Sequence, residues 1–383
     1  MQASNYACVL TNALSVEVKE VPLPNVGRED VMVKIESTGI CGSDVCWLVS
    51  LILRLLISAD AEPIQLHLYN HFGFGKARMK SPNVLGHESA GTVVEVGPDV
   101  KDVAIGDRVC IEPTMFCRRC YNCKIGKTNV CRNFRQAGME PTPGTLQQYY
   151  VCESDFVVKV PDSLSWEEAG CIQPLAIAVQ LAKRAKFAAG QTVAVFGCGP
   201  LGALVMATAR AYGVSKIIAI DISQKRVDFA RSIWADYSFI SPQKEVHQDY
   251  PDWAAAFKTE VMNDAGIDPL WGVDVAVEAS GAESCMHAGV AFTRSGGTYI
   301  QAGLGRAINS FPTVEIVAKE LDVLGSVRYT AGCFQTAIDL VASSKVDLKP
   351  LITAVFPLAR SAEALEAVRK GDDLKVVIMN QQI

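Results

Sequence analysis

The chain has 383 residues, of which 49% are hydrophobic, and a formal net charge of −5. This length favours two domains over a single core, and the acidic balance argues against a nucleic-acid or anionic-membrane partner. The N-terminal residues show no basic stretch followed by an apolar core, so no secretory signal is expected. Four of the thirteen cysteines lie in one loop, which predicts metal binding in a reducing compartment, the cytoplasm, and not disulfides.

Short strands separated by glycine and proline are predicted in the first part of the chain. Residues 31–36 alternate between apolar and polar side chains, and segments 91–97 and 106–109 are further short strands between glycines. This spacing predicts a compact antiparallel, barrel-like domain, to which we assign residues 1–162.

Strands and helices alternate from about Trp166 onwards. A helix is predicted over 167–186, with Pro174 in its first turn or at a break. The following predicted strands are 192–196, 216–220, 273–278 and 297–302, and the predicted helices between them are 201–212, 224–234 and 285–292. Such alternation predicts a doubly wound parallel sheet with helices on both faces, here over 163–307. Residues 308–383 are expected to rejoin the first domain.

The strand 192–196 runs directly into a glycine motif, Gly197, Gly199 and Gly202. With a following strand that ends in an acid, this is the dinucleotide-binding fingerprint. The first glycine permits a tight turn, the second lets the backbone approach a pyrophosphate, and the third allows close packing of helix and strand. The helix begins at Pro200 and Leu201, and its N-terminal N–H groups are predicted to bind that pyrophosphate.

Asp221 ends the second strand of the fingerprint and is predicted to accept hydrogen bonds from an adenosine ribose. Its charge would repel a 2′-phosphate and so favours NAD, although Lys225 and Arg226 leave NADP as the alternative. We expect further cofactor contacts from Arg226 and, at the ends of later strands, from the residues Glu278, Ser280 and Gly303, because open parallel sheets bind ligands at that edge.

The four clustered cysteines are Cys117, Cys120, Cys123 and Cys131. Four thiolates in one loop predict a closed, tetrahedral structural zinc site with no position for substrate. A nucleic-acid-binding zinc ribbon is the functional alternative, and the acidic charge and the nucleotide fingerprint argue against it.

A second candidate metal site is dispersed over Cys41 in Cys-Gly-Ser-Asp44 and His87-Glu88 in Gly86-His-Glu. One thiolate, one imidazole and one carboxylate would leave a fourth zinc position open for catalysis. By residue type alone, a buried structural cysteine and a structural His-Glu pair are the alternative interpretation.

Together, Gly39-Ile-Cys-Gly-Ser-Asp44, Gly86-His-Glu-Ser-Ala-Gly91, the four-cysteine loop and the glycine fingerprint resemble the zinc-containing medium-chain alcohol dehydrogenases, in particular the polyol branch of sorbitol, xylitol and arabinitol dehydrogenases. The resemblance covers nearly the whole chain. It implies a Rossmann domain beside a mostly β, GroES-like catalytic domain, two zinc ions, NAD, a polyol substrate oxidised to the ketose, and a homodimer or homotetramer.

The resemblance also implies roles for individual residues. Cys41, His87 and Glu88 would bind the catalytic zinc, and Ser43, with His67, would carry the alcohol proton toward solvent. Polyol contacts would come from three residues, Tyr69, Arg328 and Tyr329. Each has a structural alternative: Ser43 as a helix cap, for example, or Arg328 as a surface ion pair.

Two features depart from the family pattern. Gln173 stands where polyol members usually have Glu, so we expect it to be a hydrogen-bonding residue near the zinc, not a base or a ligand. No cysteine takes its place as a ligand, since Cys171 lies two positions away.

Residues 45–65 form an apolar insertion too short to span a membrane, and its removal restores the family pattern through His67 and Tyr69. We interpret it as an intron translated in frame; the alternative is a genuine lid or partner-binding helix. With Gln173, it leaves a catalytically impaired, nucleotide-binding pseudoenzyme as the second functional hypothesis.

Overall fold

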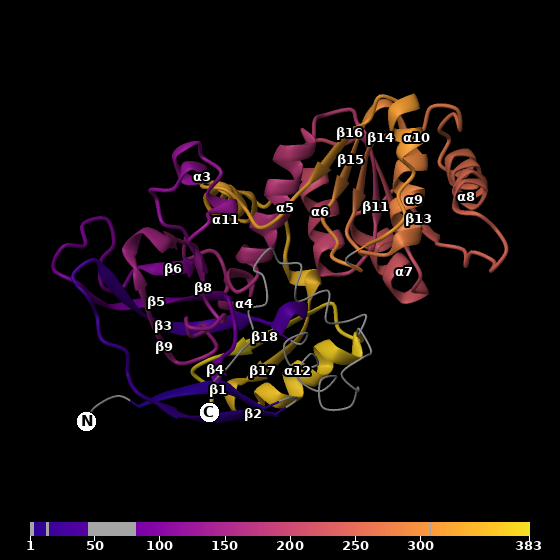
Figure 1. Cartoon of the computed structure of the whole chain (residues 1–383). Coiled ribbons are helices and arrows are strands. Elements are labelled where there is room, and N and C mark those ends of the chain that lie inside the picture. The colour runs from indigo at the N-terminus through magenta and orange to yellow at the C-terminus, as the bar shows by residue number, and fades with distance from the viewer. Residues whose placement is uncertain (1–3, 13–14, 45–81, 307) are drawn as a thin grey trace, which may run out of the picture. The chain divides into compact units, whose positions relative to one another are not determined.

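A computed structural model of the chain describes residues 4–12, 15–44, 82–306 and 308–383. The chain forms two compact units, one of Met1–Ala176 with Tyr329–Ile383 and the other of Ile177–Arg328. Figure 1 shows the strands and helices of each unit. The expected domain limits at 162 and 307 remain predictions from the sequence.

The first unit is built around a mostly antiparallel sheet with the strand order β10-β6-β5-β3-β18-β17, and β9 also pairs with β3. The strands are β3 (Asp30–Gly39), β5 (Glu88–Val96), β6 (Arg108–Ile111), β9 (Tyr149–Glu153), β10 (Val157–Lys159), β17 (Ile352–Pro357) and β18 (Lys375–Met379). Helix α12 (Ser361–Lys370) connects β17 to β18, which run parallel. A smaller sheet contains β1 (Asn5–Asn12), β2 (Ser15–Val21) and β4 (Asn83–Val84).

The first unit has two hydrophobic clusters. Val31, Val33 and Ile35 are fully buried in one cluster with side chains from β5, β6 and β9. A second cluster gathers side chains from β1, β18 and α12, among them Leu365 and Ile378. Each cluster removes apolar side chains from water and so stabilises the strands that contribute to it.

The second unit contains a six-stranded parallel sheet in the order β13-β12-β11-β14-β15-β16. Its strands are β11 (Thr192–Phe196), β12 (Lys216–Asp221), β13 (Tyr237–Ile240), β14 (Val273–Glu278), β15 (Thr293–Gln301) and β16 (Asp322–Gly325). Its helices include α6 (Pro200–Ala211), α7 (Gln224–Ile233), α8 (Tyr250–Asp264), α9 (Glu283–Phe292) and α10 (Thr313–Ala318). Helices α8 and α9 pack on one face of the sheet, with Phe257 and Phe292 in its core, while α6 covers the other (Figure 1).

The predicted α/β fold class is confirmed, and several element boundaries differ from expectation. The predicted helix 167–186 is two helices, α4 (Trp166–Ala169) and α5 (Ile172–Ala185), with Pro174 in the first turn of α5. Strand β13 and helix α8 were not predicted, because α8 carries its apolar side chains among polar ones and β13 is only partly buried. Within the described residues, no helix combines the length and apolarity needed to cross a membrane.

Glu112 gives the first unit a pH-dependent stability. Burial raises the pKa of its carboxyl from the ordinary 4.5 to about 7, so the folded state binds this proton more tightly than the unfolded state. The stability penalty is therefore absent below about pH 4.5, grows as the pH rises, and is complete above about pH 7. We predict that Glu112→Gln stabilises the protein at pH 8 by about 3 kcal/mol and has little effect near pH 4.5. Equal gains in melting temperature at both pH values would contradict this.

Candidate metal and cofactor sites

The pairing of β3 with β5 brings the dispersed metal-site candidates together. Gly39, the last residue of β3, pairs with Glu88, the first of β5. Cys41 follows β3 and His87 precedes β5, so both lie at the same end of this strand pair. One ligand atom each from Cys41, His87 and Glu88 lies within 4.8 Å of the others. A divalent ion could therefore be bound by all three side chains at once.

Asp44 orients this group. Its Oδ1 lies 3.3 Å from Nδ1 of His87, and its Oδ2 accepts the backbone N–H of Cys41 at 3.0 Å. Burial opposes the charge on both side chains, but their mutual attraction and hydrogen bond outweigh it, so the pKa of Asp44 is lowered and that of His87 is raised. With Nδ1 directed to Asp44, Nε2 of His87 is the nitrogen available to a metal.

Lys375, the first residue of β18, forms a buried ion pair with Glu88; both side chains are 2% exposed. Its Nζ also donates to the carbonyl oxygen of Ile40 at 2.9 Å. Burial disfavours the ammonium, yet the charge of Glu88 and nearby thiols raises the pKa of Lys375. The Glu88 carboxylate therefore has a cationic neighbour with or without a metal.

The other candidate residues of the first unit lie near these segments in different settings. Ser43 is half-buried in the helical residues 42–44 that follow Cys41, and Gln173 is 7% exposed in the first turn of α5. Cys171 is fully buried, which raises the pKa of its thiol to about 12, and it is not part of the three-ligand group. Residues 45–65, which include the insertion, and His67 and Tyr69 lie outside the described residues.

Arg328 and Tyr329, the expected polyol contacts, are the last residue of one compact unit and the first of the following segment of the other. Arg328 has a φ of 51°, in the left-handed region. Tyr329 is 5% exposed and packs edge-on against Phe334, with ring centroids 4.9 Å apart. Their role in binding a polyol remains a prediction.

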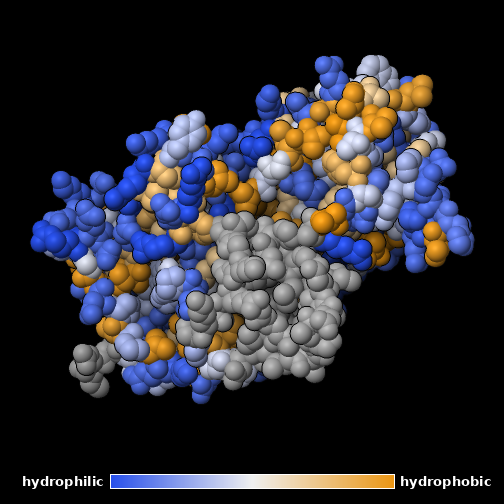
Figure 2. Space-filling view, viewed as in Figure 1, coloured by the Kyte–Doolittle hydropathy of each residue, from blue (hydrophilic) through white to orange (hydrophobic). Residues whose placement is uncertain are grey.

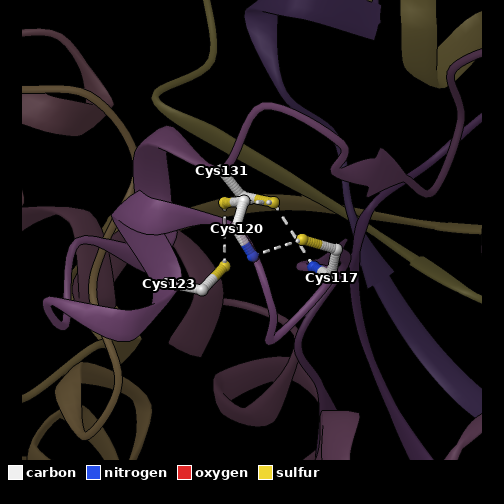
Figure 3. A group of neighbouring side chains, drawn as sticks. All are labelled: Cys117, Cys120, Cys123 and Cys131. Carbon is white, nitrogen blue, oxygen red and sulfur yellow. Dashed lines mark hydrogen bonds between the residues drawn. The ribbon is translucent and has the colours of Figure 1, made fainter.

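The four predicted cysteines form a compact cluster around the short helix α3 (Tyr121–Lys124). Their sulfur atoms all lie within 4.8 Å of one another, and their side chains face one another in Figure 3. The Sγ of Cys120 is 3.6 Å from that of Cys123 and 3.8 Å from that of Cys131. These distances exclude a disulfide and match the edge of about 3.8 Å expected for sulfurs at about 2.3 Å from a tetrahedral zinc.

Backbone groups prepare this loop for negative charge. Hydrogen bonds from the N–H groups of Cys123 and Arg132 lower the pKa of Cys120 to about 6. Burial and neighbouring thiols instead raise the pKa of Cys123, so the cluster resists full ionisation without a cation. The loop is fastened to the sheet by Arg118, whose guanidinium lies 2.7 Å from Glu153 and 2.8 Å from Asp155. This donor set fits a zinc ion bound for stability.

The glycine fingerprint adopts the predicted geometry in the second unit. Gly197 has a φ of +96°, which favours glycine, and a Cβ on Gly202 would lie 1.8 Å from the carbonyl oxygen of Gly197. Nothing lies within 4 Å of the position of a Cβ on Gly199. Gly199 caps α6 without a side-chain hydrogen bond, and the helix starts at Pro200 and Leu201. Open space at Gly199, beside a helix N-terminus without a side-chain cap, fits an anionic pyrophosphate.

Asp221 is 8% exposed at the end of β12 and joins the glycine loop to this strand. One carboxylate oxygen accepts the N–H of Cys198 at 2.7 Å and the other accepts that of Ser223 at 3.0 Å. Arg226 lies in the first turn of α7. Two strand-end candidates, Glu278 and Ser280, are hydrogen-bonded to each other.

Two family models match the chain: residues 27–162 match the alcohol dehydrogenase GroES-like domain, and residues 200–343 match the zinc-binding dehydrogenase domain. D-xylulose reductase A of Aspergillus niger is 40% identical over 377 residues, which cover 98% of this chain and 97% of that protein. The chain belongs to the zinc-containing medium-chain alcohol dehydrogenases, in their polyol branch.

Solved structures agree with this family. The L-idonate 5-dehydrogenase of Escherichia coli has a TM-score of 0.81 at 26% identity and covers 99% of both chains. A Sinorhizobium meliloti protein bound to NADP has a TM-score of 0.83 at 26% identity, covering 99% of this chain and 100% of its own. These matches confirm the fold predicted for this chain, a GroES-like domain with a Rossmann domain.

Sequence reasoning missed two residues that contact the group formed by Cys41, His87 and Glu88. Asp44 was visible only as the end of the Cys-Gly-Ser-Asp44 motif, whose spacing lets it accept the N–H of Cys41. Lys375 gave no signal, because it is separated from Glu88 by 287 positions and the pair forms only when β18 joins β3.

We predict that Lys375→Met makes stability more dependent on zinc. The substitution leaves the Glu88 carboxylate buried without its partner, a loss of about 3 kcal/mol in the zinc-free protein. A zinc ion bound by Glu88 would offset part of this loss. Thermal unfolding with EDTA and with added zinc should therefore show a larger zinc-induced rise in Tm than in the unmodified protein or in Lys370→Met, an exposed control. Equal rises in all three proteins would contradict metal binding by Glu88.

Proposed function

We propose that this protein oxidises a polyol of the xylitol, sorbitol or L-arabinitol type to the ketose, with NAD as hydride acceptor and zinc at two sites. The observation that supports this most is the convergence of Cys41, His87 and Glu88, with Asp44 behind the imidazole. A mixed set of three ligands leaves a fourth position open to substrate. The closed four-cysteine cluster would hold the second, structural zinc.

In this proposal, zinc supplies a Lewis acid that favours ionisation of a secondary alcohol. The thiolate of Cys41 and the carboxylate of Glu88 balance the charge of the ion, while Asp44 fixes the orientation of His87. Ser43, with His67, would pass the alcohol proton toward solvent. The carbinol carbon loses a hydride to NAD+, so each turnover gives one ketose, one NADH and one proton.

The nicotinamide cofactor is proposed to bind along the carboxyl ends of β11, β12 and β14. The N-terminus of α6 would bind the pyrophosphate, and Asp221 the adenosine ribose. The Asp221 carboxylate would repel a 2′-phosphate, which favours NAD; Arg226 in α7 would contact the same adenosine end. The NADP bound to the Sinorhizobium meliloti relative supports a nicotinamide cofactor in general.

The D-xylulose reductase relatives support a polyol and ketose as the substrate pair. We propose that Tyr69, Arg328 and Tyr329 contact the substrate hydroxyls, and that Gln173 donates a hydrogen bond near the metal without ligating it. The free cysteines of the described chain agree with a reducing compartment, the cytoplasm.

The test is NADH formation from xylitol, sorbitol and L-arabinitol, together with zinc content. We predict two zinc ions per chain, one for each ligand group. Cys41→Ser should lose one zinc and reduce kcat/KM by at least about a hundredfold, because a ligand lost at this site removes the metal that activates the alcohol. Cys333→Ser, a buried cysteine outside both groups, is the control and should keep both zinc ions. Full activity of Cys41→Ser would contradict the proposal.

The alternative is a pseudoenzyme that binds nucleotide but has lost catalysis, and two sequence features favour it, the insertion 45–65 and Gln173. Assays of the chain with and without residues 45–65 discriminate between the two functions. Two zinc ions with turnover that appears or rises on deletion support the dehydrogenase. Two zinc ions without turnover in either protein support the pseudoenzyme.

We also propose that the protein forms a homo-oligomer through the edge of its parallel sheet. Within the described part of the chain, β16 pairs only with β15, so its outer edge is open. Val314 and Val317 on α10 are 82% and 80% exposed, and Val323 on β16 is 42% exposed. Figure 2 shows hydrophobic side chains gathered over α10 and β16. An open edge beside an apolar patch fits a second copy related by a two-fold axis.

Val317→Glu is predicted to shift the protein toward the monomer, because it places a charge in the apolar patch. Light scattering coupled to gel filtration measures the mass. Val246→Glu is the matched control, since Val246 is 90% exposed in a loop outside this patch. A monomeric unmodified protein, or an unchanged mass for Val317→Glu, would refute this interface.

A further inference from the structure

Glu278 ends β14 and is fully buried. One of its carboxylate oxygens accepts the N–H groups of Ser280 and Gly281, each at 2.8 Å, and also the hydroxyl of Ser280. The carboxylate is thus occupied by the turn that leads into α9. A cofactor therefore has little access to it, although its position at the strand end predicted a direct contact.

The other carboxylate oxygen connects this turn to the end of β15. It accepts a hydrogen bond from Nε2 of Gln301 at 2.6 Å, and the same amide nitrogen donates to the carbonyl oxygen of Gly303 at 2.8 Å. The backbone of Glu278 also accepts the N–H of Gly303 at 2.8 Å. Side chain and main chain together hold the segment after β15 against the end of β14.

Glycines let three loops pack at this edge of the sheet. A Cβ on Gly303 would lie 2.2 Å from the nitrogen of Gly281, and a Cβ on Gly305 would lie 1.8 Å from its carbonyl oxygen. On the other side, a Cβ on Gly197 would lie 3.1 Å from the backbone of Ser280. The glycine loop 197–202 therefore lies against the turn after β14, and that turn lies against the loop after β15. The Glu278 carboxylate bonds to the turn and to Gln301 at the end of β15.

We propose that Glu278 is a positioning residue for the nicotinamide half of the cofactor, acting through the turn 279–281 and the loop 302–305 without contacting the cofactor. The inference rests on the proposed nicotinamide-dependent function. We therefore expect Glu278 to affect the binding of the nicotinamide half of the cofactor more than the binding of the adenosine half. Asp221 marks the adenosine end at β12, on one side of β11, whereas β14 and β15 lie on the other side.

Glu278→Gln tests this arrangement. An amide has one acceptor oxygen and two N–H donors, so it cannot accept from Ser280, Gly281 and Gln301 at once, and donors come to face donors. NADH affinity, measured by fluorescence titration, should fall about tenfold, as expected when buried donors lose an acceptor. The affinity for AMP, which probes the adenosine end alone, should stay within about twofold of that of the unmodified protein.

Gln301→Met is a second variant that removes the side-chain link between Glu278 and Gly303 and leaves their backbone hydrogen bond in place. It also removes the oxygen that accepts the hydroxyl of Tyr299. It should weaken NADH binding in the same direction by a smaller factor and leave AMP binding unchanged. Glu260→Gln, an exposed charge-matched substitution on α8, should change neither affinity.

The outcomes separate the inference from the proposed function. If the unmodified protein binds AMP but not NADH, or binds neither nucleotide, the proposed cofactor is wrong. If it binds NADH and Glu278→Gln binds NADH equally well, the positioning role is overturned while the cofactor stands. If Glu278→Gln loses NADH and AMP affinity by the same factor, Glu278 supports the unit in general and the selective role is also overturned.

Discussion

The candidate metal site of Cys41, His87 and Glu88 depends on the antiparallel pairing of β3 with β5. Gly39 faces Glu88 across the two strands, and a side chain at position 39 has no space, because a Cβ there would lie 2.6 Å from the Glu88 carboxylate and 2.9 Å from the Lys375 side chain. The close approach of the two backbones places Cys41 beside His87 and leaves the buried carboxylate facing a buried ammonium. An ion pair in this position is costly to break, so it holds Glu88 beside the segment that carries Cys41.

In the second unit, too, glycines allow backbone segments to approach one another closely. Its loops approach one another closely and, in the proposed function, a pyrophosphate, and side chains at these positions would keep them apart. Gly197 and Gly202 bring α6 onto β11, while Gly281, Gly303 and Gly305 bring the later loops together. Glu278 supplies the acceptors that these crowded N–H groups need. Buried polar groups are stable when every partner is satisfied, so a carboxylate is suited to a place where backbone donors converge.

Much of the fold and several of the candidate site residues could be predicted from local sequence patterns. The glycine fingerprint, Asp221 and the four-cysteine loop are short-range motifs in which spacing along the chain determines spacing in space, and the structure gives them the expected geometry. The dispersed candidate ligands Cys41, His87 and Glu88 required the family resemblance, because only the register of β3 and β5 brings them together. Lys375 was beyond prediction, since its pairing with Glu88 depends on a strand far along the chain. Glu278 was recognised as a strand-end residue, but its hydrogen-bond partners are set by tertiary packing.

The position of Lys375 in the chain affects the order in which the protein is made. Residues 177–328 form one contiguous unit, and both β18 and Lys375 lie downstream of them. During synthesis the Rossmann unit can therefore fold while the first sheet still lacks the strand beside β3. Until then the Glu88 carboxylate lacks the ammonium of Lys375 with which it pairs in the folded protein. The proposed catalytic metal site can therefore reach its final surroundings only after the segment that carries Lys375 has been made, although Cys41, His87 and Glu88 come much earlier in the chain.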